Sequence, residues 1–247
     1  MEVGRPSART IVGALLVWLL AAGSAVADPL SYEFWPEIDT WLRLSHEWRL
    51  SLFVPVSENL DTHYREGNLI AQADYAFGQA RVRRRLMDED RARSMKLFLA
   101  RGGYLGGKSL GDQGDEYTEY TAFGELHQRI PIKGGILLSH RLRSELRWLN
   151  KDTHEFSTRW RYRVMVEREF AAGRVSFVPY VNVEPYYDSR FDTVNRVRLI
   201  AGSSVGWSPH TALEVNSTYQ RDSHSSTKEL LALSVILHLF FDASHTP

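Results

Sequence analysis

The chain contains no cysteine among its 247 residues. Disulfide bonds, thiol catalysis and thiolate metal sites are therefore excluded together. The chain also lacks a net charge, because 30 basic residues balance 30 acidic ones. Proteins that bind nucleic acid usually present an excess of basic residues. We therefore expect no nucleic-acid partner.

Long apolar runs are missing beyond the first 27 residues. Residues 28–247 contain no stretch of 18 or more apolar residues, which excludes helical membrane spans. At the beginning, two arginines precede an uncharged run over residues 11–22, and small residues follow up to Ala27. This succession is typical of a secretory signal peptide, and we expect cleavage after Ala27. A retained membrane anchor is the alternative, but about 12 apolar residues are too few to span a bilayer.

What the chain has instead is a regular alternation of apolar and charged side chains. Between Ile136 and Trp148 the apolar residues fall on one parity and the charged residues on the other, and the pattern resumes over residues 156–169. A period of two is typical of β-strands, so these segments predict a hairpin with one apolar and one charged face. Strands of about 13 residues are long for a soluble protein but suit a tilted crossing of a bilayer. The pattern therefore predicts a transmembrane β-barrel with an apolar exterior and a charged interior.

Alternating segments continue through residues 28–247, which we interpret as a single domain. The expected strands are residues 30–35, 40–45, 48–56, 68–77, 94–101, 117–129, 136–148, 156–169, 175–187, 195–207, 212–220 and 228–241. The predicted fold is an all-β, antiparallel transmembrane β-barrel of about 12 strands after a cleaved signal peptide, because bacterial barrels prefer even numbers. It has 10 strands if the weak first segments are not strands. Long breaks such as residues 102–116 alternate with short turns, which predicts an outside and a periplasmic end.

The charged parity is expected to face the barrel interior, because an arginine that faces lipid at mid-depth costs about 2 to 4 kcal/mol. The candidates for lining the lumen are Glu119, Glu125, Arg141, Arg143, Glu145, Arg147, Arg159, Arg161, Arg163, Glu167, Glu184, Arg196 and Arg198. Two interpretations follow. Either acids and bases pair across the strands and plug the barrel, or an arginine ladder lines a narrow passage that attracts anions. A barrel of about 12 strands lies between filled barrels of about 8 strands and open porins of 16 to 18, so its size does not decide.

No catalytic, cofactor or metal site is predicted. Glu125 and His127 form an acid and base pair on the expected inner face, but no nucleophile motif accompanies them. The acids within residues 112–116 lack the spacing of an EF-hand, and single histidines such as His238 lack the paired spacing of a zinc site. We therefore expect a protein that is not an enzyme, with a lipid-modifying hydrolase as a less favoured alternative.

Two further features concern the surface. Residues 81–93 are rich in arginine and interrupted by acids, which favours a solvated hairpin tip over an anion or lipid-headgroup patch. Large aromatic residues lie mostly near the expected strand ends, where amphipathic rings settle at the level of the lipid headgroups. These residues are Trp35, Trp41, Trp48, Trp148, Trp160, Trp207, Tyr187 and Phe241.

Four stretches carry a resemblance to a known family. They are FGELHQRIPIKGGILLSHRLRSELRW, FSTRWRYRVMVEREF, VPYVNVEPYYDSRFDTVNRVRLIAG and LLALSVILHLFF. They resemble an uncharacterised family of Gram-negative outer-membrane β-barrels that is known as a domain of unknown function. The matching positions are Glu125, Arg141, Arg143, Arg159, Arg161, Arg163, Glu167, Pro179, Tyr180, Glu184, Tyr187, Asp188, Asn195 and Arg196. The resemblance covers the second half of the chain closely and the first half loosely, and it implies a barrel and a location but no activity.

One departure from the family pattern concerns the end of the chain. Bacterial barrels of this kind usually stop at an aromatic residue, whereas residues 242–247 follow Phe241 here. We expect Phe240 and Phe241 to serve in assembly despite this tail.

These observations predict a porin-like protein of the cell outer membrane, with a narrow pore lined by arginine and glutamate that attracts anions. A plugged scaffold barrel is the main alternative. A soluble lipocalin-like binder is another, and it would place apolar side chains inside and charges outside. The expected partners are outer-membrane lipids, lipopolysaccharide and the barrel-assembly machinery, and we expect a monomer without a cofactor.

Overall fold

The computed structural model describes residues 30–80, 95–111, 117–151, 153–172, 175–224 and 228–243. The expected signal peptide, the arginine-rich segment 81–93 and the acids within residues 112–116 lie outside the described residues. Twelve strands make up the described part of the chain. They are β1 (Leu30–Arg43), β2 (Trp48–Asn59), β3 (Arg65–Ala80), β4 (Met95–Ser109), β5 (Thr118–Ile132), β6 (Ile136–Lys151), β7 (Thr153–Arg168), β8 (Phe170–Ala172), β9 (Val175–Asp188), β10 (Thr193–Gly206), β11 (Thr211–Asp222) and β12 (Glu229–Asp242).

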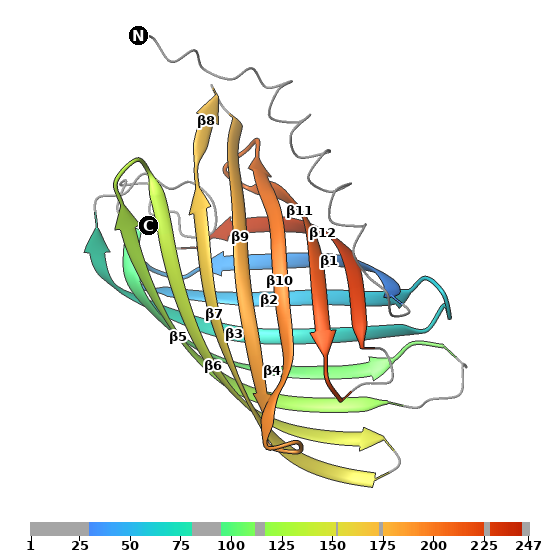
Figure 1. Ribbon diagram of the computed structural model, residues 1–247. Coiled ribbons are helices and arrows are strands. Elements are labelled where there is room, and N and C mark those ends of the chain that lie inside the picture. Colours follow the sequence, from blue (N-terminus) through green and yellow to red (C-terminus); the bar gives the residue numbers. More distant parts are fainter. Residues whose placement is uncertain are drawn as a thin grey trace.

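Eleven of these strands form a closed barrel. Each strand pairs with its sequence neighbour, β7 pairs with β9, and β12 returns to pair with β1 (Figure 1). The remaining strand, β8, pairs with β9 and extends the sheet beyond the ring. The expected all-β barrel is therefore confirmed.

The closing pair corrects the expected strand number and the expected direction of the strands. Every pair in the ring is antiparallel except β1 with β12, which run parallel from Leu30 beside Glu229 to Arg43 beside Asp242. An odd number of strands joined by hairpins forces the first and the last strand to run the same way. The barrel is thus mixed and has 11 strands, and the two ends of its sheet, at Leu30 and Asp242, lie at opposite ends of the barrel.

The count differs because the two weak segments at the beginning form one strand. β1 continues through Pro36, which lacks a backbone N–H for the ladder. The ladder between β1 and β2 is interrupted at this point, since its pairs stop at Phe34 with Glu58 and resume at Glu37 with Pro55. The proline is therefore accommodated in a gap of the pairing and does not end the strand.

Several strands also run further than expected, and the loops are correspondingly shorter. The predicted loop 102–116 is mostly strand, because β4 continues to Ser109. This strand remains paired with β3 up to Ser109 and with β5 up to Lys108. The glycine at 103 has a packing role, because a Cβ atom there would lie 2.4 Å from Cζ of Phe123 and 2.8 Å from the carbonyl oxygen of Ala71. Glycine therefore makes room for the ring of Phe123 inside the barrel. We expected an outside and a periplasmic end because long breaks alternate with short turns in the sequence. In the structure, the difference in length between the connections is smaller.

The barrel wall separates polar from apolar side chains. On β9, for example, Glu184 is fully buried whereas its neighbour Val183 is 41% exposed. Exposed apolar residues occur on every strand of the ring, among them Ile38, Leu52, Leu69, Tyr104, Leu126, Leu142, Tyr162, Val181, Leu199, Val215 and Leu233. A lipocalin-like arrangement would have the opposite facing.

The stagger of the strands sets their tilt. Following the paired registers once around the ring returns to β1 roughly 14 residues along the strand, which corresponds to a tilt of about 43°. A 14-residue strand with this tilt rises roughly 33 Å along the barrel axis. The apolar core is small, with Val178, Ala212 and Phe240 in contact, so the interior is filled mainly by polar groups.

Candidate functional site

The arginines of two neighbouring strands face one another inside the barrel. In the β6 and β7 ladder, Arg141 is directly opposite Arg163, and Arg143 is directly opposite Arg161. Like charges at directly opposed positions repel each other. These pairs therefore need carboxylates close to them.

Glu184 on β9 supplies one such carboxylate and binds three arginines. Its Oε1 accepts from Arg141 and, at 3.0 Å, from Nε of Arg161, and its Oε2 accepts from Nη2 of Arg163 at 2.8 Å. Guanidinium groups suit this role because each presents several donors in a fixed plane. One fully buried carboxylate thus holds together the arginines of two strands.

Glu125 on β5 binds another group of cations. It accepts from Nη1 of Arg101 at 3.0 Å and from Nη1 of Arg143 at 2.9 Å, and Arg141 lies 3.6 Å away. Nε2 of His127 lies 2.7 Å from Oε2 of the same carboxylate. The acid and base pair that the sequence indicates is therefore part of an ion-pair network.

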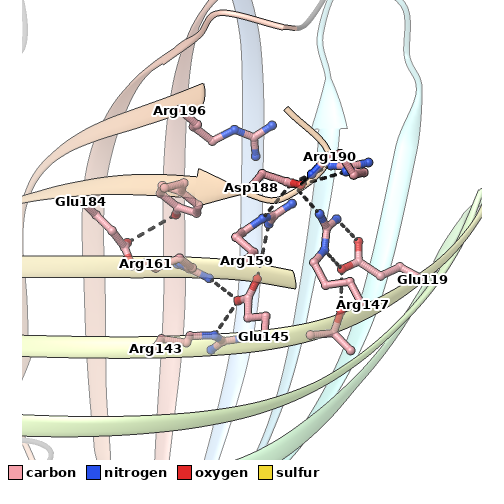
Figure 2. A network of polar contacts seen from close by, with 12 residues as sticks. Glu119, Arg143, Glu145, Arg147, Arg159, Arg161, Glu184, Asp188, Arg190 and Arg196 are labelled. Atoms are coloured by element: carbon pink, nitrogen blue, oxygen red, sulfur yellow. Dashed lines mark hydrogen bonds and ion pairs between the residues drawn. The ribbon is translucent and has the colours of Figure 1, made fainter. Parts of the chain in front are cut away.

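Glu145 on β6 links the same arginines further along the barrel. It lies 2.6 Å from Nε of Arg143, 3.1 Å from Nη1 of Arg161 and 3.6 Å from Nη1 of Arg159. Figure 2 shows the side chains of these residues converging on the carboxylate from three directions.

The network ends near the loop between β9 and β10. Arg147 binds Glu119 at 2.8 Å and reaches Asp188 at 3.3 Å, and Arg190 binds Asp188 at 2.8 Å (Figure 2). Tyr117, just before β5, donates its hydroxyl to Glu119. Burial raises the pKa of this hydroxyl, and repulsion by the Glu119 carboxylate raises it further.

We call this assembly the arginine network. It comprises eight arginines and five carboxylates: Arg101, Arg141, Arg143, Arg147, Arg159, Arg161, Arg163 and Arg190 with Glu119, Glu125, Glu145, Glu184 and Asp188. A further carboxylate, Asp74, links Arg101 to Arg49. The network therefore carries more positive than negative charge.

A second cluster gathers on the other side of the barrel. His238 of β12 lies between two carboxylates, with Nδ1 at 3.2 Å from Asp39 of β1 and Nε2 at 3.3 Å from Glu214 of β11. Tyr180 donates its hydroxyl to Glu214, and Glu37 lines the cavity beside them. We call Glu37, Asp39, Glu214 and His238 the acidic cluster.

The sequence reasoning missed the acidic cluster for an identifiable reason. Glu37 and Asp39 share one parity of β1, but the strand was expected to stop before Pro36. The alternation of Glu33, Trp35, Glu37, Asp39 and Trp41 over a single strand was the available signal. Trp35 and Trp41 also lie inside the barrel and not at its rim, whereas Trp48 and Trp148 are exposed as expected.

An internal cavity of about 760 Å³ separates the two clusters. Its lining includes residues from all eleven strands of the ring. Five of the thirteen lumen candidates line it, namely Arg141, Arg163, Glu167, Arg196 and Arg198. The other eight belong to the arginine network without lining the cavity: Glu119, Glu125, Arg143, Glu145, Arg147, Arg159, Arg161 and Glu184.

Two of the lining arginines come from β10. A shift of register between Val194 and Arg196 lets both Asn195 and Arg196 lie inside the barrel, and Arg196 binds Asp222 at 2.6 Å. Arg198 donates to Oε1 of Gln220 at 2.6 Å, and its guanidinium lies 5.1 Å from the ring centre of Trp35. Arg198 thus contacts an amide and an aromatic ring, whereas Arg141, Arg163 and Arg196 contact carboxylates.

Within the described ranges, no group of three or more histidine and carboxylate side chains is arranged to hold a metal ion. No helix in the described part of the chain is long and apolar enough to cross a membrane.

The fold and the enclosed charges define the class: a closed β-barrel with a buried network of arginine and acidic side chains. The family described as "Protein of unknown function (DUF2490)" matches residues 38–230. The chain therefore belongs to this family. This agrees with the resemblance to a family without a known activity. Searches among curated proteins and among solved structures found no match.

Proposed function

We propose that this chain is an outer-membrane β-barrel that gives small hydrophilic solutes, anions in particular, a narrow path across the bilayer. The outward surface supports the location. Charged residues at outward positions of the described strands are confined to the last two residues at a strand end: Glu58, Arg65, Lys108, Arg168, Arg221 and Glu229. A rise of roughly 33 Å also matches a hydrocarbon core about 30 Å thick.

The cavity supports a path. Its volume of about 760 Å³ is large enough for many small solutes, and its walls carry many polar and charged side chains between apolar ones. Arginine and carboxylate side chains attract hydrated ions, as charged rings do in other pores. A barrel of 11 strands is also wider than barrels of about 8 strands, whose side chains fill the interior.

The excess of arginine carries the preference for anions. Eight arginines of the network share five carboxylates, apart from Asp74, which also binds Arg101. Arg198 adds a cation that faces the cavity and, among the residues that the structure describes, has no carboxylate in hydrogen-bond contact. Anions should therefore concentrate at this side of the cavity. The proposed partners are outer-membrane lipids, lipopolysaccharide and the assembly machinery, and the proposed active form is a monomer.

Membrane fractionation tests the location. The chain should remain with outer membranes after washes with high salt and with alkaline carbonate, because its apolar exterior would be embedded in lipid. Release into the soluble periplasmic fraction would contradict the proposal.

Planar-bilayer recording tests the path. Purified protein should conduct in potassium chloride, and under a salt gradient its reversal potential should indicate preference for chloride. Arg198→Gln should shift the reversal potential towards that of a non-selective pore. Arg190→Gln is the matched control, because Arg190 belongs to the network but does not line the cavity, and it should leave the potential unchanged. Equal effects of both substitutions would refute the assigned path.

A plugged scaffold is the second candidate, and the density of ion pairs on the side of β5, β6, β7 and β9 favours it. It predicts a protein that fractionates with membranes and carries no current. Conductance therefore separates the two candidates, whereas fractionation does not.

A further inference from the structure

The cavity is flanked by opposite charges on opposing walls. Glu37 and Asp39 project from β1, while Arg141 and Arg163 project from β6 and β7. In the ring of eleven, β6 is five strands away from β1 in one direction and six in the other, so these walls are almost diametrically opposed. A solute in the cavity therefore lies between a basic and an acidic surface.

The acidic side keeps a negative charge whatever the state of its histidine. His238 contacts both Asp39 and Glu214, and a protonated imidazole carries one positive charge. Glu37, Asp39 and Glu214 together provide three carboxyl groups around it. The imidazole alone does not neutralise this cluster.

A buried acceptor on the acidic side is open to a bound donor. Oδ1 of Asp39 accepts no hydrogen bond from an N–H or hydroxyl group within the described part of the chain, although Asp39 is only 5% exposed, and its carboxylic neighbour there is Glu37. Asp39 lines the cavity. Buried acceptors in native proteins are nearly always hydrogen-bonded, and an ammonium group offers three donors.

The arginine side provides the complement. Arg163 shares its carboxylate, Glu184, with Arg141 and Arg161, and Arg141 and Arg163 are both directed to the cavity. Arg141 also lies 3.6 Å from Glu125 and Arg161 binds Glu145, so the excess belongs to the whole network of eight arginines and five carboxylates. This excess leaves positive charge at Arg141 and Arg163 that a carboxylate or phosphate of a solute can bind.

Charge separation selects among solutes. An anion is attracted by the arginines and repelled by the acidic cluster. A cation is attracted by the acidic cluster and repelled by the arginines. A molecule with one charge of each sign is attracted at both ends. We infer that the cavity binds small zwitterionic solutes, with the anionic group at Arg141 and Arg163 and the ammonium group at Asp39 and Glu214. This inference deepens the proposed function, because it names the class of solute.

The spacing of the walls indicates the length of the solute. A tilted ring of eleven strands has a backbone diameter of roughly 22 Å, and extended arginine and aspartate side chains leave about 10 Å between their charged groups. Charges joined by several bonds fit this distance better than those of an α-amino acid. 6-Aminohexanoate, whose charges are separated by five methylene groups, is a suitable probe.

Equilibrium binding to the full chain in detergent micelles tests the inference. The probe is compared with hexanoate and hexylammonium, which each retain one of its charges. We expect 6-aminohexanoate to bind at least about tenfold more tightly than either, because it gains at both walls. Equal affinity of 6-aminohexanoate and hexanoate would overturn the inference.

Substitutions locate the two ends of the solute. Asp39→Asn should abolish the advantage over hexanoate, and Arg163→Gln should abolish the advantage over hexylammonium. Asp242→Asn is the matched control, because Asp242 lies at the far end of β12 and outside the cavity lining. If Asp39→Asn fails to fold, Glu214→Gln provides the same test on the acidic wall, because Glu214 is the second acid assigned to the ammonium group and also lines the cavity. An Asp39→Asn protein that binds like the control would refute the inference.

The test of solute binding and the test of conduction can fail independently of each other. The binding assay needs no bilayer, so the zwitterion preference can hold in a barrel that carries no current. Conduction with equal binding of all three probes would leave the proposed path intact and remove only the inference about the solute.

Discussion

Buried carboxylates of the arginine network each hold two or more guanidinium groups. Glu184 binds three of them and is fully buried. The replacement of a whole ion-pair group by apolar residues is often neutral, but the removal of one partner leaves unpaired charges in a site of low dielectric constant. The network should therefore respond sharply to the loss of a single shared acid.

Glu184→Gln tests this at the most shared position. The substitution keeps the shape of the side chain but leaves Arg141, Arg161 and Arg163 without their common anion. We expect the free energy of unfolding to fall by about 3 to 5 kcal/mol. Denaturant titration of the protein in micelles, followed by tryptophan fluorescence, measures it.

Glu58→Gln is the control for this substitution. Glu58 binds Arg65 at the edge of the barrel, where the guanidinium is largely exposed. Exposed ion pairs contribute little, so the unfolding midpoint should not change measurably. A Glu184→Gln protein as stable as this control would contradict the importance assigned to the network.

The sequence predicted which residues point inwards but not which residues meet. Parity along one strand indicates its polar face, and this was sufficient to nominate Arg141, Arg163 and Glu184. Their contacts span β6, β7 and β9, and the register between strands cannot be read from the alternation within one strand. The division of the thirteen candidates between network and cavity is therefore a property of the assembled barrel.

At the scale of the strand, β4 shows why some boundaries were misjudged. Glycine usually weakens strands and marks loops, so residues 102–116 were expected to form a loop. In the barrel, Gly103 allows Phe123 to lie across its backbone. The glycine is required by Phe123 on the neighbouring strand β5, and the local sequence of β4 contains no sign of this contact.

The adjacent glycines of β4 offer a matched pair of substitutions. Gly103→Ala should lower the free energy of unfolding by about 1 to 3 kcal/mol, because the new Cβ would overlap Phe123 and Ala71. Gly102→Ala places its Cβ in open space, with no atom within 4 Å, and should be neutral or slightly stabilising. Both are measured by the same denaturant titration. Equal effects would indicate that the fit of Phe123 against β4 does not matter for stability.

At the scale of the whole molecule, the sequence predicted which side chains face inwards and which face outwards. It did not predict how the first and the last strand pair to close the barrel. Alternation alone indicates a sheet with an apolar and a charged face, and long strands indicate a barrel. The number of strands depends on whether the first segments form one strand or two, and Pro36 made them resemble two. An even count implies an antiparallel seam, whereas the single strand β1 produces a parallel one.

The parallel seam can be tested by cross-linking, because the chain has no cysteine of its own. In the parallel register, Phe34 is beside Leu233 and Ile38 is beside Leu237. Cysteine pairs at 34 with 233 and at 38 with 237 should both form disulfides on mild oxidation, since directly paired strand residues lie within the range of Cα distances that disulfides require. A shift in electrophoretic mobility that reducing agent reverses would report each bond.

The swapped pairs decide the direction of the strands. Suppose instead that β1 and β12 ran antiparallel, with residue 36 still beside residue 235. The numbers of paired residues would then have a constant sum, and cysteines at 34 with 237 and at 38 with 233 would be neighbours. In the parallel seam their difference is constant, and the swapped partners are four residues apart, roughly 13 Å along the strand. The direct pairs should therefore cross-link and the swapped pairs should not. The reverse result would require an antiparallel closure, and with it an even number of strands and both ends of the sheet at one end of the barrel.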